Sequence, residues 1–376
     1  MRIFQTIGIG FSLLLSCAGF ADEHSDFQRL VETTVIDYRA QGDLVGLGAV
    51  VVHQGDIQAM AVDGERKVRS GVALSVNDYW HIGSVTKSFT ATMIARLVEQ
   101  GRLDWQMSVG DVFADVTEVH PGWQNVTLYQ LLTHTSGADT NFSLFVHAQS
   151  PAPGLERMAA RERAVVSEIR KAPAKTPGRQ FAYSNVGYTV AGVMAEKVTG
   201  QPWEALMKQE LLRPLGLNSA GFGAPADNGT PLSQPRGHRS VFGVRIASAM
   251  DADNTPIIGP AGTLHMSMTD LATYATEHLK GRKGEGVLLP APVYDQLHQP
   301  HLDNYAMGWL VNSDDPYGLG DMIWHNGSNT RWYTLLVLFP EQDLAIAVVA
   351  NDGRISHVQS YAWQVIESIA EAWSSS

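Results

Sequence analysis

The sequence contains almost no cysteine and no excess of positive charge. Of its 376 residues only Cys17 is a cysteine, which excludes an internal disulfide framework and any metal site built from several cysteines. Acidic residues outnumber basic ones by 38 to 27, giving a formal net charge of −11. Because nucleic acids favour a basic face, this balance argues against a nucleic-acid partner and indicates a soluble acidic protein.

Several well-known catalytic and metal-binding motifs are also missing. The sequence has no Gly-x-Ser-x-Gly, no His-Glu-x-x-His and no phosphate-binding P-loop, so the motifs of α/β-hydrolases, zinc proteases and P-loop nucleotide sites are absent. The tight pair His298-x-x-His301 lies in a proline-flanked segment, which we interpret as a solvated loop. We therefore expect no metal and no organic cofactor.

No apolar run is long enough to span a bilayer, but the first residues resemble an export signal. A basic residue precedes the apolar run Ile3–Leu15, and small residues follow it. This pattern predicts that residues 1–21 form a signal peptide whose cleavage leaves Asp22 first. The alternative is a lipoprotein signal, in which Cys17 would carry the lipid. We expect a secreted or periplasmic protein, with lipid anchoring as the alternative.

Strand-like segments lie near both ends of the chain, and helical patterns fill the middle. Val45–His53 and Ile57–Val62 flank a Gln-Gly-Asp turn and predict a hairpin. Short strand-like runs recur between 307 and 350, and a helical pattern covers 357–373. One antiparallel sheet formed from both termini, flanked by helices and carrying a mainly helical insert, explains this order better than two successive domains. The fold class is therefore α/β (α+β).

This prediction gives one domain over 22–376 with two lobes. We place the α/β lobe at about 25–80 and 285–376, and the helical lobe at about 81–284. The substrate cleft is expected between them.

The clearest helix in the sequence begins at a candidate nucleophile. Apolar residues recur at helical spacing from Ser84 to Gln100, and the chain's one Ser-x-x-Lys, Ser84 to Lys87, opens this pattern. Residues i and i+3 share a helix face, so the Lys87 amine can reach the Ser84 hydroxyl. A serine needs a base to remove its proton, and a lysine can be that base if burial lowers its pKa. The alternative is an ordinary surface helix start.

Two later motifs are informative because of their order along the chain. Tyr183-Ser184-Asn185 follows a turn and, on its own, is typical of a loop aromatic with a capping asparagine. His325-Asn326-Gly327-Ser328 lies between two strand-like runs and, on its own, is typical of a polar hairpin turn. Together with Ser-x-x-Lys they form an ordered set.

That set resembles the penicillin-recognising serine hydrolases, which include class C β-lactamases, D-alanyl-D-alanine carboxypeptidases, D-aminopeptidases and β-lactamase-like esterases. Segments 127–137, 259–272 and 338–351 are similar to further blocks of the same family. The resemblance covers about residues 25–370 and implies a β-lactamase/DD-peptidase-like fold.

The resemblance also implies a role for each matching residue. Ser84 would be the nucleophile that forms an acyl-enzyme, with Lys87 beside it as base or electrostatic partner. Tyr183 would belong to the base system, its pKa lowered by nearby cations. His325 would be the catalytic residue that opens the third motif. The substrate-binding positions are three further residues: Asn185 would orient Lys87 and bind the substrate amide, Gly327 would leave room for substrate, and Ser328 would share the oxyanion hole with Ser84 through backbone N–H groups.

One position departs from many family members. Class C β-lactamases have Lys-Thr-Gly where this chain has His325-Asn326-Gly327, and a histidine carries positive charge only when protonated. Arg331 would supply a missing charge or would be an exposed strand-edge arginine.

We therefore expect an exported serine hydrolase acting on a small amide or ester, with D-Ala-D-Ala-type peptides first. The alternatives are an esterase, then a class C-like β-lactamase, then a catalytically silent binding or sensor domain. The expected partner is a small molecule or short peptide, and the sequence does not fix the oligomeric state.

Overall fold

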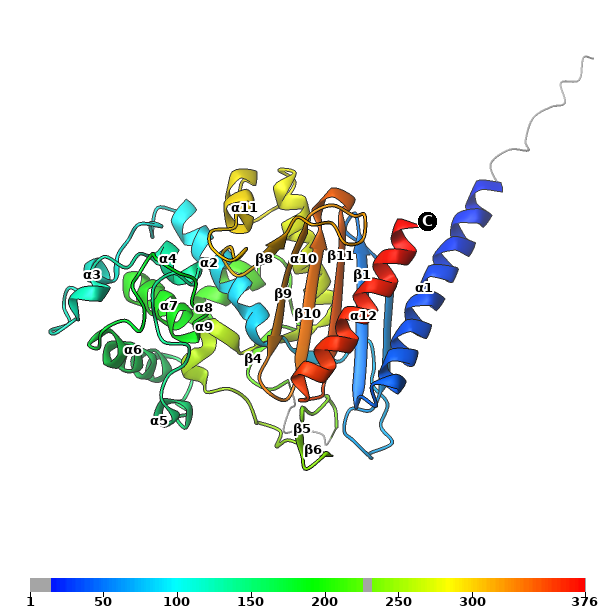
Figure 1. Ribbon diagram of the computed structural model, residues 1–376, viewed down its shortest axis with the longest axis horizontal. Helices are drawn as coiled ribbons and strands as arrows, with labels where there is room; N and C mark the ends of the chain where they lie inside the picture. Colours follow the sequence, from blue (N-terminus) through cyan, green and yellow to red (C-terminus); the bar gives the residue numbers. More distant parts are fainter. Residues whose placement is uncertain (1–14, 226–231, 376) are drawn as a thin grey trace, which may run out of the picture.

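The centre of the molecule is an antiparallel sheet to which both ends of the chain contribute. The computed structural model describes residues 15–225 and 232–375, with side chains from residue 26 onward. Within this part the main sheet has the strand order β2-β1-β11-β10-β9-β8 (Figure 1). Its strands are β1 (Gly46–His53), β2 (Asp56–Gly64), β8 (Leu310–Asn312), β9 (Met322–Ser328), β10 (Tyr333–Phe339) and β11 (Leu344–Ala350). The predicted fold class is confirmed.

The inner strands are buried on both faces, which explains their continuous apolar sequences. Alternate residues of β1 point to opposite sides: Leu47 and Val51 pack in one core cluster, and Val50 in the other. The helices α1 (Leu15–Gln41) and α12 (Ile355–Ser374) cover the first face. The long helix α10 (Met268–Arg282) packs against β1 and β11 on the other side, although its residues lie in the range expected for the helical lobe.

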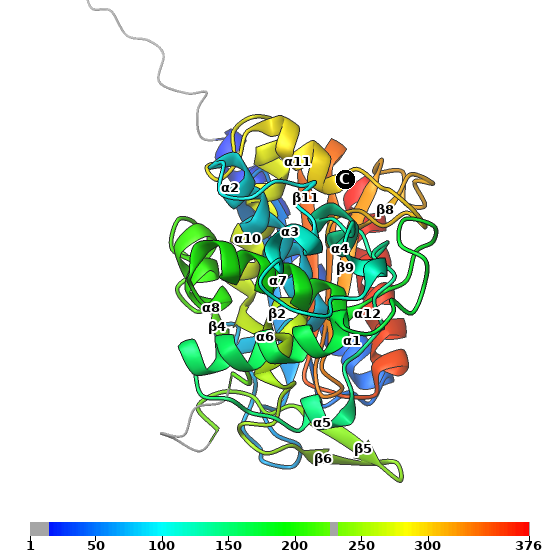
Figure 2. The same cartoon turned by 90° about the vertical axis from the view of Figure 1, so that its left-hand side faces the viewer.

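The remaining helices gather on one side of the sheet, and Figure 2 shows them in front of it. The helix predicted from Ser84 begins slightly later, at Thr86, because Ser84 lies in the 3₁₀ turn Gly83–Val85, and most of its residues are buried. These helices are α2 (Thr86–Glu99), α3 (Val109–Val112), α4 (Leu128–Leu132), α5 (Leu144–His147), α6 (Leu155–Ile169), α7 (Asn185–Thr199), α8 (Trp203–Met207), α9 (Gly259–Gly262) and α11 (Ala291–His298). Short strands complete the structure: β3 (Tyr79–His81), β4 (Gly221–Phe222), β5 (His238–Val241), β6 (Val244–Ala247) and β7 (Leu264–Ser267).

One local prediction is wrong. His298 is not in a solvated loop: it is the last residue of α11 and is buried, with its Nε2 atom 3.0 Å from Nδ1 of His278. The proline at 300 ends the helix just beyond His298. Of the two histidines, only His301 is exposed.

The predicted export signal falls largely outside the described residues. Residues 1–14 are not described, and α1 is described from Leu15. Cleavage before Asp22 and lipid attachment at Cys17 therefore stay predictions. Among the described residues, no helix combines the length and apolar content needed to cross a bilayer.

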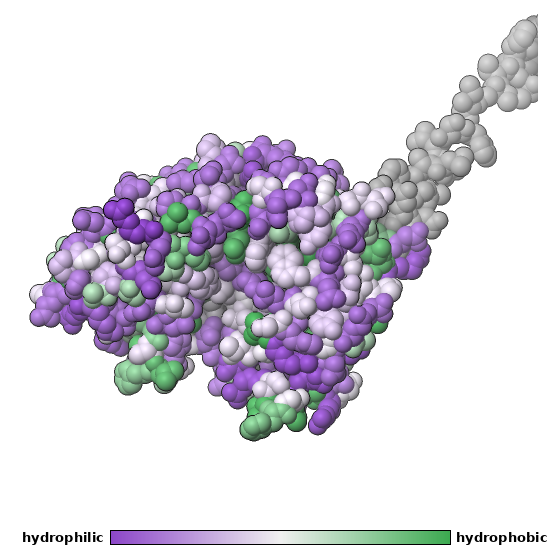
Figure 3. All heavy atoms as spheres, in the orientation of Figure 1, coloured by the Kyte–Doolittle hydropathy of each residue, from purple (hydrophilic) through white to green (hydrophobic). Residues whose placement is uncertain are grey.

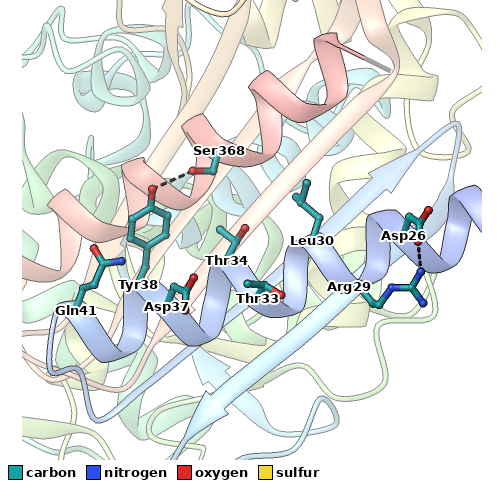
Figure 4. A pocket seen from close by; sticks show the side chains of 9 residues that line it. All are labelled: Asp26, Arg29, Leu30, Thr33, Thr34, Asp37, Tyr38, Gln41 and Ser368. Carbon is teal, nitrogen blue, oxygen red and sulfur yellow. Dashed lines mark hydrogen bonds and ion pairs between the residues drawn. The ribbon is translucent and has the colours of Figure 1, made fainter.

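Two surface features lie apart from the motif residues. Figure 4 shows a groove along α1, where the Tyr38 hydroxyl lies 3.0 Å from Ser368 Oγ of α12. Figure 3 shows apolar atoms gathered on two prominences with a hollow between them, where Figure 1 has α5 and the β5–β6 hairpin. The strongly exposed apolar residues of these elements are Leu144 and Phe145 on α5 and Phe242 in the hairpin turn.

Candidate active site

The Ser-x-x-Lys motif folds into a tight turn followed by a buried helix. Ser84 is half-buried in the 3₁₀ turn Gly83–Val85, and Lys87 lies in the first turn of α2. The Lys87 side chain is fully buried, and its Nζ atom is 3.1 Å from Ser84 Oγ. The predicted proximity of these two groups is therefore present in the structure.

Two other oxygens fix the orientation of the Lys87 amine. Nζ donates to Asn185 Oδ1 at 2.7 Å and to the backbone oxygen of Ala261 at 2.8 Å. Both oxygens can only accept, so they take two hydrogens of the amine. A neutral amine then has its lone pair left for the third neighbour, the Ser84 hydroxyl. This is the arrangement that a general base for Ser84 requires.

Burial also favours the neutral form of this amine. It lowers the pKa of Lys87 well below its ordinary value of 10.5, because a charged ammonium loses its hydration inside the protein. Burial therefore increases the share of Lys87 that is neutral, with a free lone pair, at pH values below 10.5.

Tyr183 lies next to both groups, but its acidity differs from the prediction. The Lys87 Nζ atom is 4.7 Å from the centre of the Tyr183 ring, and the phenol hydrogen-bonds with Ser84. Burial raises the pKa of Tyr183 above its ordinary value, and the bond to Ser84 only partly opposes this. The expected lowering is wrong because burial removes the phenol from water, which disfavours its anion. Tyr183 is a neutral phenol in the free protein.

The chain turns into α7 directly after Tyr183, and this turn places Asn185. The N-cap of α7 is Ser184, whose Oγ accepts from the Gly187 amide at 2.8 Å. Asn185, the first helical residue, is therefore not the cap. Its Nδ2 donates to Asn141 Oδ1 at 2.6 Å, so its Oδ1 atom is left for Lys87.

His325 lies on β9 with both ring nitrogens bonded inside the protein. Nδ1 is 2.5 Å from the Asn326 backbone oxygen, which can only accept, so Nδ1 carries a hydrogen. In the neutral ring Nε2 then accepts from the Tyr305 hydroxyl at 3.1 Å. Burial lowers the pKa of His325 to about 3, helped by the nearby Lys87. His325 is neutral at pH 7 and does not replace the lysine of Lys-Thr-Gly as a cation.

The end of β9 lies directly against the turn that holds Ser84. A Cβ atom added to Gly327 would lie 2.0 Å from the Ile82 oxygen and 2.6 Å from the Ser84 nitrogen. A Cβ on Gly83 would lie 2.2 Å from the Ser328 nitrogen. The two glycines therefore let the backbones meet, bringing the Ser84 and Ser328 amides together. Gly327 was predicted to leave room for substrate; its close neighbours are backbone atoms of the Ser84 turn instead.

Comparison with known protein families identifies the family of this chain. A family model described as Beta-lactamase matches residues 31–371. The chain belongs to the Beta-lactamase family. This places it among the β-lactamase-like serine hydrolases.

Two curated proteins are similar to this Beta-lactamase family member at low sequence identity. Protein flp of Staphylococcus aureus (strain COL) is 22% identical over 335 residues, covering 87% of this chain and 64% of the relative. The chain thus spans less than two thirds of the length of that protein. Penicillin-binding protein 4 of Amycolatopsis lactamdurans is 27% identical over 331 residues, covering 84% of this chain and 83% of the relative.

Solved structures share the family fold. The D-amino acid amidase from Ochrobactrum anthropi SV3, complexed with L-phenylalanine amide, has a TM-score of 0.74 at 18% identity, covering 93% of this chain and 99% of the amidase. A D-stereospecific amidohydrolase from Streptomyces has a TM-score of 0.67 at 22% identity, covering 90% and 98%. At these identities the likeness shows the fold alone.

The Arg331 side chain is hydrogen-bonded to a nearby backbone oxygen. It is half-buried, and its Nη1 donates to the Asn329 backbone oxygen at 3.1 Å. The exposed strand-edge alternative is therefore wrong. Burial lowers the pKa of Arg331 from its ordinary value.

The individual residues of an aromatic cluster behind the site were not predicted from the sequence. The rings of Tyr183, Tyr188 and Tyr305 surround His134, with centroids 4.4, 5.1 and 4.6 Å from it. His134 Nδ1 accepts from the Ser184 amide at 3.1 Å, and burial lowers the His134 pKa. His134 lies within segment 127–137, so the resemblance of that segment was the available signal. No group of three or more His, Cys, Asp or Glu suited to a metal occurs in the described part of the chain.

Proposed function

We propose that this protein hydrolyses a small amide or ester through an acyl-enzyme on Ser84. The observation that carries the proposal is the position of the Lys87 amine. Its Nζ atom lies 3.1 Å from Ser84 Oγ and donates its two hydrogens to Asn185 and Ala261, which leaves the lone pair for Ser84. A serine hydroxyl beside a neutral, oriented amine is an activated nucleophile.

The steps follow from this arrangement. Lys87 accepts the Ser84 proton as Oγ attacks the substrate carbonyl carbon. The oxyanion that forms accepts hydrogen bonds from the Ser84 and Ser328 amides, at the contact between β9 and the nucleophile turn. The tetrahedral intermediate then expels its amine or alcohol, which takes the proton back from Lys87 through the Tyr183 hydroxyl. A water molecule then attacks the acyl carbon and gives its proton to Lys87. As the bond from the acyl carbon to Ser84 Oγ breaks and the acid leaves, Lys87 returns that proton to Ser84 Oγ.

For the substrate, we favour compounds with D-configured residues, such as D-Ala-D-Ala ends and D-amino-acid amides. The similar folds titled D-amino acid amidase and D-stereospecific amidohydrolase support this class. Within it, the neutral state of His325 favours substrates without a free carboxylate next to the scissile bond, that is, D-amino-acid amides and esters ahead of D-Ala-D-Ala ends. The same observation supports an esterase as the second candidate, and it argues against class C-like β-lactam turnover.

We also propose that the protein is exported by its first 21 residues and works outside the cytoplasm, either free or anchored through Cys17. The mass of the mature N-terminus from membrane and soluble fractions tests this. A start at Asp22 supports cleavage, a lipid adduct on Cys17 supports anchoring, and an intact Met1 contradicts both.

Ser84→Ala tests the catalytic proposal. Wild type and variant are incubated with D-Ala-D-Ala peptide, a D-amino-acid amide, nitrocefin and p-nitrophenyl esters, and with a fluorescent phosphonate. Turnover and labelling should be lost in the variant while its melting temperature stays unchanged. Labelling retained at another residue would overturn the assignment, and a wild type without product or mass shift would favour a silent sensor domain.

A further inference from the structure

Asp253 lies behind the proposed oxyanion site and contacts both of the segments that form it. Its side chain is only 6% exposed. Its Oδ1 atom accepts from Asn329 Nδ2 at 2.7 Å and lies 2.9 Å from His81 Nε2. Residues 81 and 329 belong to different parts of the fold, so one carboxylate oxygen joins them.

His81 fixes the backbone just before the nucleophile. Its Nδ1 atom accepts from the Gly83 amide at 3.0 Å, so the hydrogen of the neutral ring is on Nε2, the nitrogen that faces Asp253. The ring is fully buried, and the backbone oxygen of His81 accepts from Thr334 Oγ1 at 3.2 Å. The orientation of the ring thus sets the course of the chain into Ser84.

Asn329 fixes the backbone just after Ser328. Its side chain is 2% exposed, and its Oδ1 atom accepts from the Arg331 amide at 3.2 Å. The Nδ2 group is therefore turned toward Asp253. This amide holds the end of β9, where the second oxyanion donor lies.

The Asp253 carboxylate is better suited to aligning its two neighbours, His81 and Asn329, than to stabilising the fold. Oδ1 accepts the Asn329 hydrogen bond and lies within ion-pair distance of His81 Nε2. In the described part of the chain, Oδ2 and His81 Nε2 are both buried without a hydrogen-bond partner. Burying a carboxylate that is only half satisfied costs free energy. A group kept at such a cost beside a reactive centre is typical of a functional constraint.

We propose that Asp253 is a positioning residue that ties His81 to Asn329 and so sets the spacing of the Ser84 and Ser328 amides. It does not touch the substrate. The inference rests on the proposed function, because it assigns these two amides to the oxyanion.

The test compares Asp253→Ala, which removes the shared oxygen, with the matched control Asp251→Ala, at an exposed aspartate two residues away. Each is assayed on an ester and on its thionoester, whose sulfur accepts hydrogen bonds weakly. Since loss of one oxyanion donor costs about 100- to 1000-fold in kcat, we expect Asp253→Ala to lower kcat on the ester by about 30- to 300-fold, with KM within about twofold. The thionoester should lose less than about fivefold, and Asp251→Ala should match wild type on both.

A second variant keeps the test decisive if Asp253→Ala folds poorly. Asn329→Ala removes one arm of the link and should show the same selective loss on the oxygen ester. Equal losses on both esters, or a raised KM at unchanged kcat, would overturn the positioning role. That failure is distinct from failure of the proposed function, which shows itself as activity retained in Ser84→Ala.

Discussion

At the scale of single residues, the proposed chemistry requires Lys87 to be neutral before the reaction and charged during it. The Lys87 Nζ atom lies 4.7 Å from the Tyr183 ring centre and 5.6 Å from that of Tyr188. Ring faces attract cations, and more strongly where water is excluded. In the proposed mechanism, the two tyrosines are thus placed to stabilise the ammonium that Lys87 becomes when it takes the Ser84 proton.

The pH dependence of the reaction follows from the lowered pKa of Lys87. The base is active when deprotonated, so kcat/KM should rise with pH through the lowered pKa and reach its plateau well below 10.5. A pH profile on a p-nitrophenyl ester from pH 5 to 10 measures this limb. A limb near or above pH 10 would point to an ordinary lysine or to the Tyr183 phenol as the base.

Lys87→Arg provides a matched test of the same residue, because it keeps a long cationic side chain. A guanidinium stays protonated and cannot accept the Ser84 proton. Since general-base catalysis contributes about 10²- to 10⁴-fold, we expect kcat to fall within that range. Activity within tenfold of wild type would show that Lys87 acts by charge alone.

At the scale of elements, the site depends on how closely β9 approaches the nucleophile turn. In Gly327→Ala, the new methyl group would lie 2.0 Å from the Ile82 oxygen, and no flexible side chain is there to move. Overpacking of this kind costs about 1 to 3 kcal/mol or more. We expect urea unfolding to show that loss, together with strongly reduced turnover, because the two amides would be pushed apart.

Gly187→Ala in α7 is the control for this change. The nearest atom to its added Cβ is the Leu131 oxygen at 3.4 Å, an ordinary contact, and alanine favours a helix over glycine by up to about 1 kcal/mol. This variant should be as stable as wild type or slightly more so. If both variants behaved alike, close approach at Gly327 would not explain its presence.

The elements near the motifs could be predicted from local sequence. The hairpin of β1 and β2 follows from its turn residues, and the Ser84–Lys87 proximity follows from helical spacing. The role of Asp253 could not be predicted in this way. It lies in an irregular segment without apolar periodicity, and its partners at 81 and 329 are distant in sequence. The pKa of Tyr183 was mispredicted for a related reason, since burial arises only from the assembled fold.

At the scale of the whole molecule, buried histidines make stability depend on pH. His278 of α10 and His298 of α11 are buried side by side, and burial lowers the pKa of His278 to about 3. The unfolded chain, with a histidine pKa near 6.5, binds a proton there that the folded protein does not. The contribution of the neutral His278 to stability is therefore fully present above about pH 6.5 and is lost as the pH falls below that value.

His278→Gln isolates the contribution of that residue. Between pH 7.5 and 5.5 the wild type should lose more unfolding free energy than the variant, by about 1.4 kcal/mol for one such histidine. Urea unfolding at both pH values gives the difference. His301→Gln, at an exposed histidine, should follow the wild type, and an identical pH response in all three proteins would contradict the prediction.

The sheet with strands from both ends also determines when the molecule can fold. Leu47 of β1 pairs with Ala350 of β11, across almost the whole length of the chain. During synthesis β1 therefore has no partner on that edge until the last strand has been made, and its apolar residues stay uncovered meanwhile. Such distant pairing makes folding slow and exposes the growing chain to aggregation. The main sheet can therefore close over that edge of β1 only when nearly the whole chain has been made.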